Sequence, residues 1–131
     1  MELNEPRGTI LICEDNIVNL KLLRDVLRYQ KFRLIEAMDG KTALEKIKEF
    51  KGEIDLILMD LKLPEMDGNE VIKIVKSDDS TKDIPIFVIS AHAMEEDIKK
   101  ALKAGCNNYI TKPINLEDFM HKIDAFFIHR I

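Results

Sequence analysis

The sequence predicts an α/β fold, a doubly wound, five-stranded parallel sheet with five helices. Two observations carry this prediction. Short apolar runs alternate along the chain with amphipathic segments of helical period. Some of these runs are almost wholly apolar, which is typical of strands that are buried on both faces of a parallel sheet. The length of 131 residues suits a single domain, whose core we expect to span about 8–128.

In the first half of the chain, strands and helices are expected alternately at 9–13, 16–28, 32–37, 40–50 and 55–59. The apolar character of 9–13 and 55–59 favours central strands. In the first helix the apolar arc is wider than the usual stripe of about 100°, which indicates packing against the sheet and a neighbouring helix. The residues of this arc are Val18, Leu20, Leu22, Leu23, Val26 and Leu27. The second helix has one clear stripe, formed by Ala43, Leu44, Ile47 and Phe50.

In the second half, strands are expected at 85–90 and 108–110, and helices at 68–76, 95–104 and 115–128. Pro85 is tolerated as the first residue of a strand, where a missing N–H does not break the ladder. Gly105 closes the fourth helix, because glycine is a common C-terminal residue. Asn115 is expected to cap the last helix. The core stripe of that helix is predicted to be Leu116, Phe119, Met120, Ile123 and Phe127.

The composition is that of a globular domain, with 46% hydrophobic and 34% charged residues. A net charge of -4 argues mildly against nucleic-acid binding. No apolar stretch approaches the ~18–20 residues of a membrane span. The two cysteines, Cys13 and Cys106, are expected to be reduced and buried, so we expect a cytoplasmic protein.

Ionisable residues follow three of the expected strands. Glu14 and Asp15 follow the first strand, Asp60 follows the third, and Lys112 comes just after the fifth. The carboxyl ends of parallel strands meet at one edge of the sheet, where such folds bind ligands. Clustered carboxylates are costly unless a cation joins them. The pattern therefore predicts a divalent metal site, with Mg²⁺ the best match and Mn²⁺ compatible, in which one acidic group is left to do chemistry.

These residues resemble the receiver domain of response regulators. The resemblance runs from about Gly8 to the end of the chain and rests on five short pieces, which are Glu14-Asp15-Asn16, Asp60, Pro64-Glu65-Met66-Asp67-Gly68, Ser90-Ala91 and Tyr109-Ile110-Thr111-Lys112-Pro113. Each piece alone is weak, but their order and their places at strand ends form a strong signal. The resemblance implies a flavodoxin-like receiver fold. It also implies two-component signalling, in which a histidine kinase or a histidine phosphotransfer protein passes a phosphoryl group to Asp60.

The resemblance assigns further roles. It implies that Asp15, Asp60 and the backbone carbonyl of Lys62 bind the metal, with Glu14 acting through a water molecule. Lys112 would place its ammonium on the phosphoryl oxygens, next to a cis peptide bond.

Ser90 would donate a hydrogen bond to the phosphoryl group. Ser90 and Tyr109 together would form a two-position switch. We expect that switch to change a surface formed by the fourth helix, fifth strand and fifth helix, where a downstream protein binds.

Two more sets of residues are hypotheses about phosphoryl lifetime and docking. Lys62 lies two residues after Asp60, and His92 lies two residues after Ser90. We expect both to influence how readily water attacks the acyl phosphate, although an exposed loop histidine with no role is an equal alternative for His92. By resemblance, the phosphoryl donor would contact a patch formed by Asn16, Ile17, Asn19, Pro113 and Ile114.

Two other function classes stay open. One is a Mg²⁺-dependent phosphohydrolase with an aspartate nucleophile, but enzymes similar to the haloacid dehalogenase family carry a second acid where Lys62 stands. The other is an interaction module that is no longer phosphorylated, against which the combination of Asp15, Asp60, Ser90 and Lys112 argues. The chain fits a stand-alone regulator as well as one domain of a longer protein.

Overall fold

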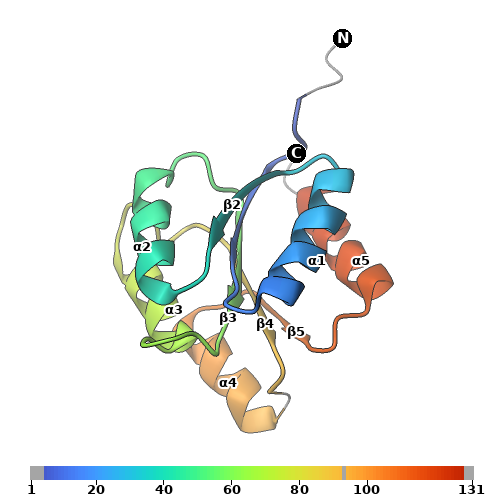
Figure 1. The fold of residues 1–131 in the computed structure, drawn as a ribbon. Helices are drawn as coiled ribbons and strands as arrows, with labels where there is room; N and C mark the ends of the chain where they lie inside the picture. The colour runs from blue at the N-terminus through green and yellow to red at the C-terminus, as the bar shows by residue number, and fades with distance from the viewer. Residues whose placement is uncertain (1–4, 93, 129–131) are drawn as a thin grey trace.

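Strands and helices alternate along the whole described chain, which comprises residues 5–92 and 94–128 of a computed structural model (Figure 1). The strands are β1 (Thr9–Cys13), β2 (Arg33–Ala37), β3 (Leu56–Asp60), β4 (Ile86–Ser90) and β5 (Asn108–Thr111). The helices are α1 (Ile17–Tyr29), α2 (Gly40–Glu49), α3 (Gly68–Ser77), α4 (Glu95–Ala104) and α5 (Leu116–Ile128). All ten elements expected from the sequence are present, and their ends differ from the predicted ends by at most one residue.

The five strands form one parallel sheet in the order β2-β1-β3-β4-β5. Helices α1 and α5 cover one face of the sheet, and α2, α3 and α4 cover the other (Figure 1). The doubly wound α/β prediction is therefore confirmed. The central strand is β3, and the register pairs its last residue, Asp60, with Ile89 on β4. This arrangement brings the carboxyl ends of β1, β3 and β4 to the same edge of the sheet.

Side-chain caps mark the starts of α1, α2, α3 and α5, whereas α4 begins after Met94 without one. The side-chain oxygen of Asn16 accepts hydrogen bonds from two backbone N–H groups of α1. Asp39 and Asp67 cap α2 and α3, each accepting from one backbone N–H group. Asn115 accepts from the backbone N–H of Asp118 at 3.0 Å, as predicted for the last helix. At the other end of α4, Gly105 has a φ of 122°, which suits glycine at a helix C-terminus.

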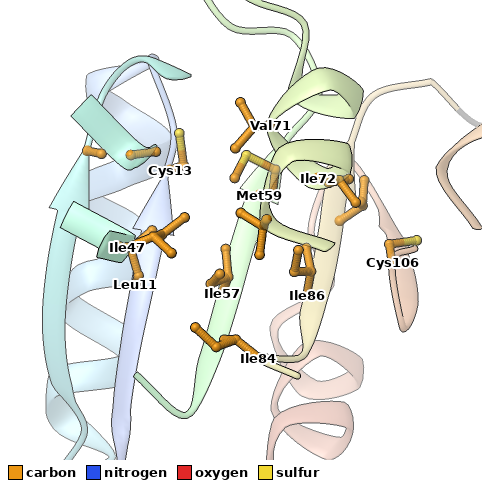
Figure 2. Close-up of a cluster of buried hydrophobic side chains, with 14 of the residues drawn as sticks. Leu11, Cys13, Ile47, Ile57, Met59, Val71, Ile72, Ile84, Ile86 and Cys106 are labelled. Atoms are coloured by element: carbon orange, nitrogen blue, oxygen red, sulfur yellow. The ribbon is translucent and has the colours of Figure 1, made fainter. Parts of the chain in front are cut away.

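The core has two layers, one on each face of the sheet. Figure 2 shows the layer under α2, α3 and α4, in which Leu11 and Ile57 from the sheet face Ile47 and other helical side chains. Cys13 and Cys106 belong to this layer, so the prediction of buried free cysteines is confirmed. Burial is the main cause that raises the pKa of Cys13 to about 12, and burial also raises the pKa of Cys106.

Some apolar residues assigned to the core by periodicity lie at the surface instead. Val18 is 72% exposed, and Leu22 and Leu116 are also exposed. On α1, the buried positions are Leu20, Leu23 and Leu27, which form the usual narrow stripe. Packing therefore explains only part of the wide apolar arc. Among the described residues, no helix has both the length and the apolar character to cross a membrane.

Candidate functional site

Three acidic side chains meet at the carboxyl edge of the sheet. Asp60 ends β3 and is 5% exposed, and Glu14 follows β1 and is 1% exposed, whereas Asp15 is open to solvent. One carboxylate oxygen from each of the three lies within 4.8 Å of the others. The hydrogen bond from the Glu14 backbone N–H to the Ala37 carbonyl extends the ladder past β1 and fixes the start of this loop.

Lys112 closes the site from the end of β5. Its Nζ donates to Glu14 Oε1 and to Asp60 Oδ2, both at 2.9 Å. Its backbone N–H donates to the Ser90 carbonyl at 2.8 Å, and the peptide bond to Pro113 is cis, as the resemblance implies. The other oxygen of Asp60, Oδ1, accepts from the Lys62 backbone N–H at 3.0 Å. Both oxygens of the Asp60 carboxylate are therefore held in place.

The electrostatics of the site favour an added cation. Burial raises the pKa of Glu14, and the hydrogen bond from Lys112 offsets only part of that effect. Burial pulls the pKa of Lys112 down, but its hydrogen bonds to Glu14 and Asp60 outweigh burial and leave the pKa above its usual value. One ammonium is thus shared between two buried carboxylates, with Asp15 beside them. Hard carboxylate oxygens in this number suit Mg²⁺, so the residues present fit such an ion.

The expected switch residues meet at the backbone of His92. Ser90, the last residue of β4, is fully buried, and its Oγ accepts from the His92 N–H at 3.1 Å. The Tyr109 hydroxyl donates to the His92 carbonyl at 2.6 Å. Burial is the main cause that raises the pKa of Tyr109. The backbone of His92 is therefore tied to both residues, a link that the sequence does not reveal because every residue has the main-chain atoms that His92 contributes.

Lys62 and His92 both line one pocket of about 170 Å³ between the β3–α3 segment and α4. The other lining residues are Leu61, Asp67, Asn69, Asp97 and Lys100. Asn69 was not singled out by the sequence, because a polar residue in the first turn of a helix is ordinary. In the structure Asn69 is buried.

The residues expected to dock a phosphoryl donor gather at the same edge of the sheet as the acids. Ile17 is 58% exposed at the start of α1, directly after the loop that carries Glu14 and Asp15. Asn16 and Pro113 are exposed, and Asn19 and Ile114 are half-buried. Val18 adds a second exposed apolar side chain that the predicted patch did not include.

Comparison with known proteins places the fold and site in a family context. Residues 10–124 match the model of the response regulator receiver domain. The polar-differentiation response regulator DivK of Brucella anthropi is 38% identical over 118 residues, which cover 90% of this chain and 94% of DivK.

Solved structures agree with this match. The receiver domain of a sensor histidine kinase from Pseudomonas aeruginosa PAO1, with a magnesium ion coordinated in its active site cleft, is 28% identical with a TM-score of 0.83. The alignment covers 92% of this chain and 97% of that one. A CheY-like receiver domain protein from Methanospirillum hungatei is 27% identical with a TM-score of 0.82, covering 93% and 94% of the two chains.

Proposed function

This chain belongs to the response regulator receiver domain family, and from that premise we propose that Asp60 accepts a phosphoryl group from a phosphohistidine of a histidine kinase or phosphotransfer protein. The observation that carries the proposal is the placement of Asp60. Its carboxylate is buried, oriented through both oxygens, and flanked by one ammonium and two further acids. A phosphoryl acceptor needs this combination of orientation and nearby positive charge.

In the proposed step, an Asp60 carboxylate oxygen attacks phosphorus, the P–N bond breaks, and its electron pair returns to the donor imidazole. An acyl phosphate on Asp60 results, and attack by water later releases inorganic phosphate. Lys112 lies 2.9 Å from Asp60 and would neutralise phosphoryl oxygens. A Mg²⁺ or Mn²⁺ ion held by Asp15, Asp60, Glu14 and the Lys62 carbonyl would supply further charge neutralisation.

Phosphorylation is tested by exposing the chain to acetyl phosphate with Mg²⁺ and measuring base-labile phosphate by intact mass spectrometry. We expect Asp60→Asn to abolish labelling while the fold survives. Asp79→Asn, which changes a side chain that is 97% exposed, is the matched control and should be labelled like the unchanged chain. Label that persists in Asp60→Asn would contradict the assignment, and rapid steady release of phosphate would favour a phosphohydrolase.

We propose that Ser90 and Tyr109 pass the signal outward through His92. The support is the pair of hydrogen bonds that holds the His92 backbone between them. A downstream protein would read the change on the face formed by α4, β5 and α5.

Lys62 and His92 are also proposed to set the lifetime of the acyl phosphate. Their support is their shared pocket beside the Asp60 loop. The test is the decay rate of the phosphorylated chain. If neither Lys62→Ala nor His92→Ala changes that rate, this role is contradicted.

The phosphoryl donor is proposed to dock on the exposed start of α1 and the Pro113–Ile114 loop. The support is the apolar side chain of Ile17, which is 58% exposed beside the acids. Ile17→Ser should slow phosphotransfer from a protein donor but not from acetyl phosphate. Tyr29→Ser, at the far end of the same helix, is the control. A cytoplasmic location is part of the proposal, because two free, buried cysteines suit a reducing compartment.

A further inference from the structure

Asn69 presents a buried hydrogen-bond acceptor that has no partner. The residue is 7% exposed, and its Oδ1 is the one buried side-chain oxygen or nitrogen without a hydrogen bond within residues 5–92 and 94–128. Its backbone N–H is bound by Asp67 at 2.8 Å, which fixes it in the first turn of α3. An unpaired acceptor in the interior is costly, so its presence calls for a functional explanation.

The pocket that Asn69 lines is also lined by residues from α4 and from the loop before it. Asn69 and Leu61 belong to the β3–α3 side of the pocket, and His92, Asp97 and Lys100 belong to the α4 side. Lys100 is exposed, and in the described part of the chain its ammonium has neither a hydrogen bond nor an ion pair. A free donor on α4 and an unpaired acceptor on α3 therefore share one small pocket.

Lys100 is better placed than the other two donors to act on Asn69. Lys62 lies on the same β3–α3 side of the pocket as Asn69, and its backbone N–H donates to Asp60, so a hydrogen bond from Lys62 would not join α4 to α3. The backbone of His92 is held at its N–H and at its carbonyl. Lys100 lies on α4, which comes soon after His92 in the chain, so a displacement of the His92 backbone would change the distance of Lys100 from α3.

We propose that Asn69 is a positioning residue of the switch. When Asp60 carries a phosphoryl group, the Lys100 ammonium donates a hydrogen bond to Asn69 Oδ1 and joins α4 to α3. This inference rests on the proposed function, since it needs a phosphorylated or phosphate-like state of Asp60. It assigns to the α3–α4 pocket a role in stabilising the activated state, beyond the Asp60 site and the α4-β5-α5 face.

The test is a double-mutant cycle on the affinity for beryllofluoride, a phosphoryl mimic, in the presence of Mg²⁺. Asn69→Leu and Lys100→Met remove the acceptor and the donor with little change in size. We expect each to weaken binding about tenfold, the change that one hydrogen bond to a charged group represents. We expect the double variant to bind no more weakly than either single variant. Lys103→Met alters another exposed lysine of α4 outside the pocket and should bind like the unchanged chain.

Control measurements separate the outcomes. Asn69→Leu removes an unpaired acceptor, so the urea midpoint of this variant without beryllofluoride should not fall. If the leucine side chain destabilises the fold, Asn69→Ala takes the place of Asn69→Leu in the cycle. Additive effects of the two substitutions on beryllofluoride affinity would overturn the inference and leave the proposed function standing. The inference would also be overturned if the two substitutions were coupled to the same degree in urea unfolding without beryllofluoride. The hydrogen bond between Lys100 and Asn69 would then be present in both states. Failure of the unchanged chain to bind beryllofluoride would overturn both proposals.

Discussion

Gly68 lies against the backbone that carries Asp60, which makes it a sensitive point for both stability and function. A Cβ atom at this position would lie 2.6 Å from the Asp60 carbonyl oxygen and 2.6 Å from the Leu61 Cα. Both are main-chain atoms at the end of the central strand, so they cannot turn away as a flexible side chain could. Gly68→Ala must therefore shift either α3 or the end of β3.

The expected magnitude follows from two opposing effects. Alanine is favoured over glycine inside a helix by up to about 1 kcal/mol. Overpacking by one methyl group against a rigid neighbour costs about 1–3 kcal/mol. Because both close contacts are with backbone, we expect the steric cost to win and the free energy of unfolding to fall by about 1–2 kcal/mol. The same displacement should weaken beryllofluoride binding.

The assay is urea denaturation followed by circular dichroism, with Gly52→Ala as the matched control. A Cβ atom at Gly52 meets nothing within 4 Å, so this second glycine-to-alanine change should leave stability unchanged or slightly raised. Equal midpoints for the two variants would refute the argument that Gly68 is required by the approach of α3 to Asp60.

Two further predictions concern ion pairs and pH. Lys112→Met leaves the buried carboxylates of Glu14 and Asp60 facing each other, which should lower the free energy of unfolding at neutral pH by about 3 kcal/mol. Burial holds the Glu14 pKa above its ordinary value of 4.5, so the folded variant takes up a proton more readily than the unfolded chain. The loss of unfolding free energy should therefore shrink as pH falls toward that value. A loss of unfolding free energy that is constant in urea titrations across pH would contradict this prediction. Arg24→Met removes two hydrogen bonds of 2.6 and 2.8 Å to Glu36 and should slightly lower the free energy of unfolding at neutral pH. The hydrogen bond from Arg24 lowers the pKa of Glu36. The stabilisation by this pair is therefore present above the ordinary glutamate pKa and is lost as pH falls through the lowered pKa. If the variant stays less stable than the unchanged chain in acid, packing of Arg24 is responsible and not the charge pair.

Most of the fold could be predicted because strand and helix signals agree along the chain. The apolar runs of β1 and β3 indicate buried parallel strands, and side chains such as Asn115 mark helix starts. Periodicity predicted the exposed residues less well. It places Val18 and Leu116 on the apolar side of their helices, but it does not say where a neighbouring element stops covering them.

The functional site, like the fold, could be predicted only in part. Its acids and its lysine could be predicted because they occupy strand ends, which a parallel sheet brings together whatever the details of packing. The direct contact between Lys112 and Glu14 depends on side-chain reach across the sheet edge, so it becomes visible only in three dimensions. The link from Tyr109 to His92 uses a backbone carbonyl, which every residue has.

The two cysteines described above make the chain well suited to site-directed labelling. Both thiols are buried, and their raised pKa values keep the reactive thiolate scarce at neutral pH. A maleimide should therefore react first with a cysteine introduced at the surface. Lys73→Cys on α3 and Lys103→Cys on α4 replace exposed residues, so a pair of spin labels or fluorophores at these positions would report the α3–α4 separation without removal of the native cysteines.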